Sequence, residues 1–496
     1  AQHRFSQLRQ LATKVFDVDE AVRVLPGSTN ARQQLVSASL QYLEGLASDA
    51  RGDLDLDEEI GEGYLRVARV QGVPNELNLG QYAEADANLK KADAFNQAVL
   101  GARPRKRSAL LRSAVIAQDR MILAQEEHRR EEALAETRKA AAGLDAFLQL
   151  AGSTEYERLE AAMIYSNLAL AQVNLHLYPD AIAYARRAVD LARPVPSDHG
   201  LLAGAYSVLA NALRYQGDLE GALQAIEQAR KVAEQAVYPT ETARLMNLFG
   251  IFLREGLILG EVEAPNLNRP VEAIESLRKA FDMAEAAARK DQVDAMSRSR
   301  VANAGNPLGN ILRNREPDKA LVVYELSIRR LSEIRNQTAA RRDQAMLLAN
   351  SSYALRALRR NQEAKKRIYA ALEILKETKD YPAQRIALSS QVFNVVRAEA
   401  DYEAEFGDVE HARQIYEQLL AEVTAAKPEF LNDLRDAPKI SELYSALETL
   451  YRRTGDIENA ESMKARRLDL WRHWDQKLPN NAFVLRQLAL TRHAVL

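Results

Sequence analysis

The sequence predicts an all-α protein: a TPR-like α-α superhelix, or solenoid, of about nine to ten helical hairpins with long helices. The 496-residue chain is 47% hydrophobic but only 6% aromatic, so its core must be built mainly from Ala and Leu. It has 21 Gly and 15 Pro, too few for a turn-rich β protein or a disordered chain. An alanine also follows a polar turn at intervals of 41 to 51 residues. Such regular repetition is typical of solenoids.

The repeated segment is a polar turn, often Gly-Asp, followed by an alanine near the start of a second helix. In the fourth unit, Tyr206, Leu209 and Leu213 precede Ala222 by 16, 13 and 9 residues. These are the packing offsets of a tetratricopeptide repeat (TPR) hairpin. TPR units usually have about 34 residues, so the longer interval predicts helices of roughly 20 residues plus loop insertions. The nine marker alanines are Ala85, Ala133, Ala181, Ala222, Ala273, Ala320, Ala364, Ala412 and Ala460.

Two of the predicted insertions resemble each other. Asn78-Leu79 precedes Glu84-Ala85, and Asn266-Leu267 precedes Glu272-Ala273 in the same register. Each insertion also follows a proline-containing turn. Duplication of a larger block and convergent turn chemistry both explain this similarity.

The repeat pattern divides the chain into three predicted parts. Residues 1–50 are expected to form an N-terminal helical hairpin, broken at Pro26-Gly27. Residues 51–480 form the repeat solenoid, and residues 481–496 a C-terminal capping helix of the kind that solenoids need. No flexible linker interrupts the repeats, so we expect one continuous solenoid.

Composition and motifs exclude several functions. The net charge of −2 gives no electrostatic footprint for nucleic acid. The absence of cysteine excludes disulfides, thiolate catalysis and Cys-ligated zinc. No apolar stretch of about 18 residues predicts a membrane span, and the seven histidines show no metal-ligand spacing. We therefore predict no catalytic residue, no cofactor and no metal.

Three local clusters each allow a functional and a structural interpretation. The acidic segment 53–59 lacks the Gly and Glu that a calcium-binding EF-hand loop requires, so an acidic helix N-terminus is favoured. The basic segment 103–112 is either an anion-binding patch or a solvated turn, and we favour the turn because no aromatic side chains lie nearby. Trp471 and Trp474 share a helix face. They either stack on a ligand or, as we favour, pack under the terminal helix.

The candidate binding residues are asparagines on the first helices of the hairpins. When each marker alanine is numbered 20, three of them fall at position 6, which in TPR proteins faces the concave groove. An amide offers two donors and an acceptor, so it can bind the backbone of an extended peptide. The alternative is that these side chains are merely solvated or cap local turns. The six predicted groove residues are Asn167, Asn306 and Asn350 at position 6, with Asn211, Asn247 and Asn310 in matching or neighbouring positions.

Segments near both ends carry a family resemblance. Residues 25–32 (Leu-Pro-Gly-Ser-Thr-Asn-Ala-Arg), 71–75 (Gln-Gly-Val-Pro-Asn) and 474–481 (Trp-Asp-Gln-Lys-Leu-Pro-Asn-Asn) resemble the C-terminal TPR region of bacterial serine/threonine protein kinases. The kinase motifs themselves, the Gly-rich loop, His-Arg-Asp and Asp-Phe-Gly, are absent from this chain. The resemblance therefore implies a sensor or docking region, or a stand-alone relative, and it carries no catalytic residue over.

The predicted function is a scaffold that binds a protein or peptide in its concave groove. By the same resemblance, it would lie on the extracytoplasmic side of the cytoplasmic membrane, with a cytoplasmic location as the alternative. A small-molecule-sensing solenoid and a structural or oligomerisation scaffold are the alternative functions, and a homo-oligomer is compatible with each of them.

Overall fold

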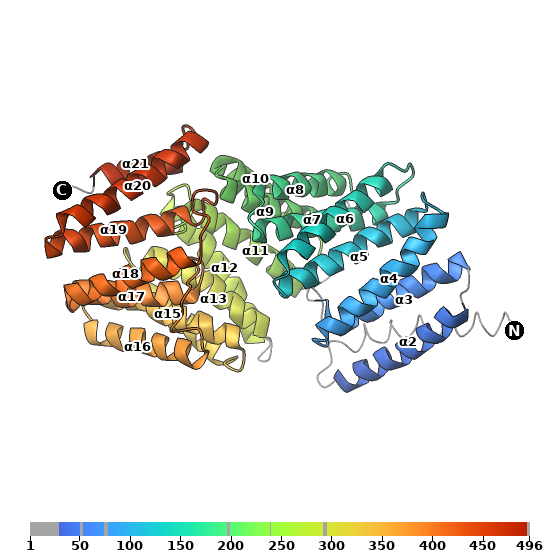
Figure 1. The fold of residues 1–496 in the computed structure, drawn as a ribbon, viewed down its shortest axis with the longest axis horizontal. Helices are drawn as coiled ribbons and strands as arrows, with labels where there is room; N and C mark the ends of the chain where they lie inside the picture. The colour runs from blue at the N-terminus through green and yellow to red at the C-terminus, as the bar shows by residue number, and fades with distance from the viewer. Residues whose placement is uncertain are drawn as a thin grey trace. The chain divides into compact units, whose positions relative to one another are not determined.

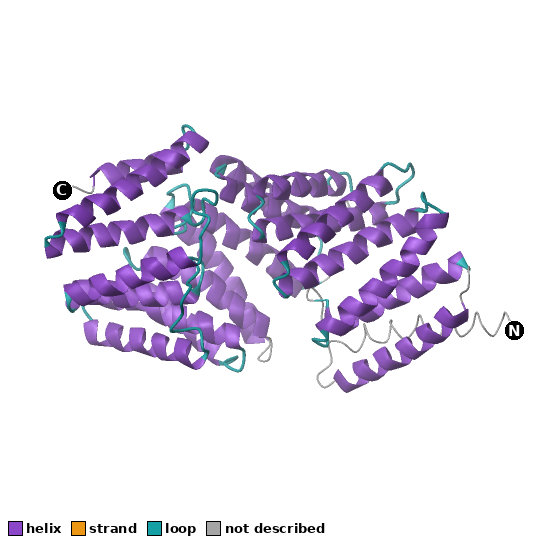
Figure 2. Ribbon diagram, in the orientation of Figure 1, coloured by secondary structure: helices purple, strands orange, loops and turns teal. Residues whose placement is uncertain are grey.

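A computed structural model describes residues 29–49, 53–73, 78–195, 199–238, 240–290 and 295–493. Within these ranges the regular structure is entirely helical, which confirms the all-α prediction (Figure 2). The first predicted helix, residues 2–24, lies outside the described residues. The chain forms two compact units, which divide after residue 197 and are described separately below.

The described part of unit 1 holds one helix followed by three antiparallel hairpins (Figure 1). Consecutive helices within each hairpin pack along their lengths. The helices are α2 (Thr29–Asp49), α3 (Leu54–Gly72), α4 (Tyr82–Ala102), α5 (Arg107–Glu126), α6 (Arg130–Leu148), α7 (Glu155–Asn174) and α8 (Tyr178–Ala192).

Unit 2 holds six further hairpins and a terminal helix (Figure 1). Its helices are α9 (His199–Gln216), α10 (Leu219–Gln235), α11 (Glu241–Gly260), α12 (Pro270–Lys290), α13 (Ala295–Leu312), α14 (Pro317–Ser332), α15 (Thr338–Ala357), α16 (Asn361–Glu377), α17 (Gln391–Phe406), α18 (Val409–Ala425), α19 (Ala437–Thr454), α20 (Ile457–Lys477) and α21 (Ala482–His493).

The marker alanines explain how the hairpins pack. All nine are 0% exposed, and each lies near the start of the second helix of its hairpin. A methyl side chain at this crossing lets the two helix backbones approach closely, while the larger apolar residues around it fill the remaining space. The hairpin helices are 15 to 21 residues long, so the long interval between alanines does reflect long helices.

Two of the Gly-Asp turns join their helices by a left-handed glycine followed by a capping aspartate. Gly217 and Gly455 take positive φ angles of 103° and 81°, which a residue without a Cβ adopts readily. The following aspartate then caps the next helix: the carboxylate of Asp218 accepts the amide of Gly221 at 2.9 Å, and that of Asp456 accepts the amide of Asn459 at 3.1 Å.

The two similar insertions have the same backbone hydrogen bonds. The Nδ2 atoms of Asn78 and Asn266 each donate to the carbonyl five residues earlier, at 3.0 and 2.9 Å. Each Oδ1 accepts the amide two residues later, at 2.8 and 2.7 Å. The amides of Leu79 and Leu267 each reach the carbonyl nine residues earlier, at 3.0 and 2.9 Å. The two turns thus have the same geometry at an offset of 188 residues, which both the duplication of a larger block and convergent turn chemistry explain.

The first and last hairpins of unit 2 contact each other. Asn481, at the start of α21, donates from Nδ2 to the carbonyl of Gly217 at 2.8 Å, across 264 residues of chain. Leu219 joins the same buried cluster as core residues of α15 to α21, and the Arg435 guanidinium lies 4.9 Å from the Tyr215 ring centroid. Unit 2 is therefore a superhelical turn whose two ends meet.

Candidate binding groove in unit 2

The acidic segment near residue 53 is a helix N-terminus, as favoured from the sequence. The carboxylate of Asp53 caps α3 by accepting the amides of Asp55 and Leu56 at 3.1 and 3.2 Å. Oδ1 of Asp53 therefore satisfies two backbone donors that a helix end leaves free. In the part of the chain that the structure describes, no group of His, Asp or Glu side chains is arranged to hold a metal ion.

The basic segment at residues 103–112 forms ion pairs with this acidic segment. Neither the anion-binding patch nor the solvated turn considered from the sequence predicted these pairs. Arg103, at the end of α4, lies 2.7 Å from Asp55 of α3, within the first hairpin. Arg112 of α5 lies 3.5 Å from Glu58 of α3, so this second ion pair connects the hairpin of α3 and α4 to α5. The segment is therefore a link between successive hairpins, since its charges are partly neutralised within unit 1.

The two tryptophans pack under the terminal helix, as favoured from the sequence. Trp471 is 0% and Trp474 5% exposed. The Trp471 ring meets the Phe483 ring of α21 edge-on, with centroids 5.9 Å apart. Each indole N–H is also satisfied, at 2.9 Å from Ser441 Oγ and from the Phe430 carbonyl. These contacts leave no indole face or N–H for a ligand to use.

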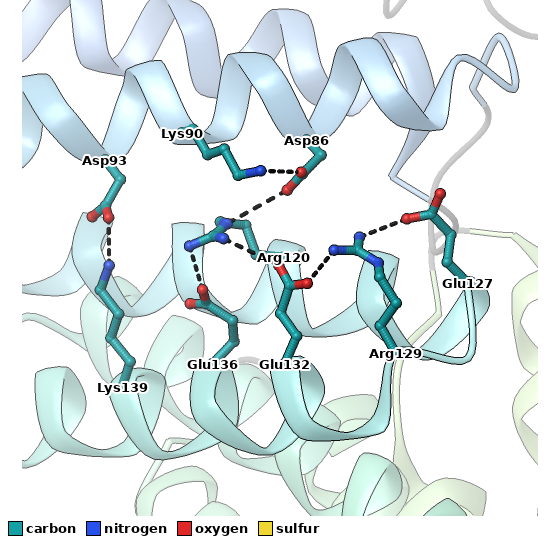
Figure 3. Close-up of polar contacts among 9 residues, drawn as sticks. All are labelled: Asp86, Lys90, Asp93, Arg120, Glu127, Arg129, Glu132, Glu136 and Lys139. Carbon is teal, nitrogen blue, oxygen red and sulfur yellow. Dashed lines mark hydrogen bonds and ion pairs between the residues drawn. The ribbon is translucent and has the colours of Figure 1, made fainter.

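Unit 1 also contains an ion-pair network on α4, α5 and α6 (Figure 3). At its centre, the Arg120 side chain is 13% exposed and pairs with Glu136, with Glu132 at 3.2 Å and with Asp86 at 3.6 Å. Arg129 joins Glu132 from the other side. Because every charge drawn faces an opposite charge (Figure 3), the network braces three helices.

Unit 2 has a cavity of about 270 Å³ on three successive first helices. Most of its wall is apolar, and a few polar side chains converge on it, which is the usual composition of a ligand pocket. The lining residues are Leu253 and Leu257 of α11, Glu261 beyond its end, Ala302, Asn303, Asn306 and Pro307 of α13, and Asp343, Met346 and Leu347 of α15. A second cavity of about 220 Å³ includes Glu261 and Asn310.

Three of the six predicted asparagines lie together here. Asn306 lines the larger cavity, and its Oδ1 accepts a hydrogen bond from Nδ2 of Asn350 at 2.8 Å. Asn350 itself is 5% exposed, so it orients Asn306 from behind. Asn310 lines the smaller cavity, and its Oδ1 accepts the Tyr324 hydroxyl at 2.7 Å. Asn306 therefore lines the larger cavity, and Asn350 holds its side chain by the hydrogen bond to Oδ1.

The other three asparagines lie elsewhere. Asn167 belongs to unit 1, where its Nδ2 donates to Gln118 Oε1 at 3.0 Å. Asn247 donates to the Gly200 carbonyl at 3.4 Å, and its buried Oδ1 has no hydrogen-bond partner among the described residues. Asn211 is partly buried on α9 and lines neither cavity. Asparagines at matching or neighbouring positions of the repeat therefore lie in several different environments.

Three features of the larger cavity were not predicted. Burial raises the pKa of the Asp343 carboxyl above its ordinary value, although a hydrogen bond from Gln391 Nε2 at 2.9 Å lowers it in part. Pro307 lies inside α13 and has no N–H, so the Asn303 carbonyl loses its helical donor. Glu261 reaches the wall from the insertion after α11. The sequence alone could have predicted the effect of Pro307 on its helix. The positions of the Asp343 and Glu261 carboxylates could not be predicted, because they depend on how the helices pack.

The comparisons with known proteins agree with this fold. The tetratricopeptide repeat family matches residues 160–235. The solved structure of the apo form of RapI is similar, with a TM-score of 0.50 and 10% identity, covering 80% of this chain and 97% of that one. The chain is a TPR-like helical solenoid.

Two further solved structures are similar at lower TM-scores. The apo form of the quorum sensor NprR from B. thuringiensis has a TM-score of 0.44 and 11% identity, over 91% of this chain and 99% of that one. A Rap protein complexed with competence and sporulation factor has a TM-score of 0.42 and 12% identity, over 77% and 98%. No curated protein sequence matches the chain. Among the described helices, none combines the length and apolar character that crossing a membrane requires.

Proposed function

We propose that this solenoid is a scaffold that binds a protein segment or peptide, and that the segment lies along α11, α13 and α15 of unit 2. The supporting observation is the Asn306 side chain, which lines an apolar cavity and is held in place by Asn350 at 2.8 Å. Its amide can donate to and accept from a peptide backbone, whatever the peptide's side chains. The apolar walls contributed by Leu253, Leu257 and Met346 would bury side chains of the bound segment.

We further propose that the scaffold is the sensor or docking region of a membrane-linked serine/threonine kinase system. This proposal rests on the sequence segments 25–32, 71–75 and 474–481 alone. The coding sequence upstream of residue 1 provides the test. We expect it to encode a kinase domain and then a membrane-spanning segment, which would place the solenoid on the extracytoplasmic side. An unrelated upstream sequence would contradict the proposal.

The peptide-binding proposal is tested with selected ligands. Peptides that bind the full chain are selected from a random library, and their affinities are measured by fluorescence anisotropy. Asn306→Ala removes a hydrogen-bonding group worth about 1 kcal/mol, so we expect binding to weaken about 5- to 10-fold. Asn350→Ala should act in the same direction because it frees the Asn306 side chain.

Asn394→Ala is the matched control for these variants. Asn394 is a partly buried asparagine on α17, and its Nδ2 bonds only within its own helix, to the Ser390 carbonyl at 3.0 Å. We expect this variant to bind as the parent does. If selected peptides bind all three variants equally, and thermal unfolding shows each of them folded, the groove assignment is wrong.

A further inference from the structure

The insertion after α11, residues 261–269, connects distant parts of unit 2. Glu263 pairs with Arg397 of α17 at 2.6 Å, across 134 residues of chain. The Pro265 carbonyl accepts Nε of Arg214 on α9 at 2.8 Å. The carbonyl of Asn266 accepts Nη2 of Arg486 on α21 at 2.9 Å. The insertion therefore contacts the beginning, middle and end of the superhelical turn.

The Glu263 carboxylate faces more positive charge than it can neutralise. Burial raises its pKa, but the charges of Arg397, Arg313 and Lys439 lower it more, so that the pKa lies below its ordinary value. Among the described residues, no carboxylate lies at ion-pair distance from Arg313 or Lys439. Arg313 instead lies 4.3 Å from the Tyr353 ring centroid, and Lys439 donates to the Leu388 carbonyl at 3.0 Å. Burial lowers the pKa of Lys439, although the charges of Glu261, Glu263 and Asp436 raise it in part. Basic side chains from three helical hairpins thus lie around the Glu263 carboxylate.

Other acids also lie near this cluster. Asp401 lies 3.8 Å from Arg397, but its two oxygens accept the hydroxyls of Tyr353 and Tyr416, each at 2.5 Å. Burial raises the pKa of the Glu442 carboxyl, which disfavours its charged form. Glu261 and Asp436 face Lys439, and Glu263 is the carboxylate that pairs with Arg397 at 2.6 Å.

The backbone around Glu263 suits an exchangeable contact. Its φ of 61° is left-handed, a conformation that costs a non-glycine residue on the order of 1–2 kcal/mol. A largely buried ion pair also contributes little net stability, because the desolvation of both charges offsets their attraction. Replacing this carboxylate with one from another chain would therefore cost the fold little.

We propose that Arg397, Arg313 and Lys439 form a carboxylate-binding site for an acidic residue of the bound partner segment, and that Glu263 occupies this site in the free protein. This inference rests on the proposed function and adds the partner's chemistry and a form of regulation. Glu261, at the start of the same insertion, lines both cavities, so the site adjoins the groove. As an intramolecular competitor at millimolar effective concentration, the insertion would weaken the binding of any acidic segment.

The test uses the insertion's own sequence as a soluble probe. A labelled octapeptide of residues 261–268, Glu-Val-Glu-Ala-Pro-Asn-Leu-Asn, is titrated into the full chain, alongside the same peptide with Gln in place of its second Glu. The proteins are the parent, Glu263→Gln, and a chain with residues 262–265 replaced by Gly-Ser-Gly-Ser. We expect the two altered proteins to bind the Glu peptide at least 10-fold more tightly than the parent, and the Gln peptide at least 10-fold more weakly than the Glu peptide.

Two further variants attribute the effect to the site. Arg397→Gln, combined with Glu263→Gln, should abolish the preference for the Glu peptide. Glu272→Gln makes the same charge change at an exposed position of α12 and should bind as the parent does. Equal binding of the two peptides, or no binding to the chain with the replaced insertion, would overturn the inference. Peptides selected for the groove would still bind in an Asn306-dependent manner in that case, so the proposed function would stand separately.

Discussion

At the scale of single residues, the asparagines that line the cavities of unit 2 are already hydrogen-bonded to other side chains of the protein. Asn350 donates to Asn306, and Tyr324 donates to Asn310, at 2.8 and 2.7 Å. Such pairing removes the cost of burying an unsatisfied amide. It also fixes the rotamer of the partner that lines a cavity, so these asparagines have a structural role even without a ligand.

Asp343 gives a pH-dependent prediction at this scale. Burial raises the pKa of its carboxyl in the folded protein, so the folded state binds more protons than the unfolded state between the ordinary and the raised pKa. Its contribution to stability is therefore present below the ordinary pKa and is lost as pH rises through the raised one. Asp343→Asn should remove this loss, because an amide oxygen can still accept from Gln391.

The measurement is the difference in melting temperature between Asp343→Asn and the parent at several pH values. We expect the variant to gain stability relative to the parent as pH rises above about 4, the ordinary pKa of an aspartic acid. Glu272→Gln, at an exposed position, should show no such trend. A difference that stays constant with pH would show that burial does not govern the Asp343 carboxyl.

At the scale of elements, α13 depends on glycines where α12 and α14 pack against it. A Cβ built on Gly309 would lie 2.5 Å from the Tyr324 ring, and one built on Gly305 would lie 3.0 Å from the Phe281 ring. Tyr324 is 0% exposed, so its ring has no free space into which it could move. Because glycine has no side chain, α13, which carries Asn306 and Asn310, can pack closely against its neighbours.

Gly309→Ala should therefore destabilise the protein. Overpacking of a tight core typically costs about 1–3 kcal/mol. Gly204→Ala is the control: Gly204 lies inside α9, and a Cβ there would meet nothing within 4 Å. That change should stabilise by up to about 1 kcal/mol, because alanine favours a helix over glycine. Urea unfolding of both variants measures the two effects, and equal effects would contradict the packing argument.

The sequence predicts the elements well because their signals are local. The marker alanines identify the hairpins, since a small residue is needed at each crossing, and all nine are buried. The similarity of the Asn78 and Asn266 insertions was also readable, because the amide side chain forms the turn itself. The pairing of Glu263 with Arg397 was not readable, since it joins residues 134 positions apart and depends on the curvature accumulated over three hairpins.

The candidate site was predictable only in part for the same reason. Numbering the repeat positions placed Asn306 and Asn350 at the same position on the first helices of successive hairpins, and their side chains do contact each other. It could not separate them from Asn167, which lies in unit 1. It also could not show that Asp343 and Glu261 reach the same cavity, because side chains from α15 and from an insertion meet only after the helices have packed.

At the scale of the whole molecule, the closure of unit 2 is the feature with the greatest consequence. The turn at Gly217 meets Leu434, Leu478 and Asn481 from the end of the chain. A groove inside a closed turn has a curvature fixed at both ends, whereas an open solenoid flexes along its length. The first helices α11, α13 and α15, which line the larger cavity, belong to this closed turn.

Gly217→Ala should open this closure. A Cβ at this position would lie 2.6 Å from Leu478 Cδ1, and the φ of 103° already disfavours alanine. Gly152→Ala is the matched control, because Gly152 has a φ of 83° but open space around it. Both variants should lose roughly 1–2 kcal/mol to backbone strain. Only Gly217→Ala should speed hydrogen exchange in α21, since only there does the new methyl group displace Leu478 and the Asn481 contact. Mass spectrometry resolves this by segment, and α21 amides that exchange equally slowly in both variants would show that the ends of unit 2 are held together by other contacts.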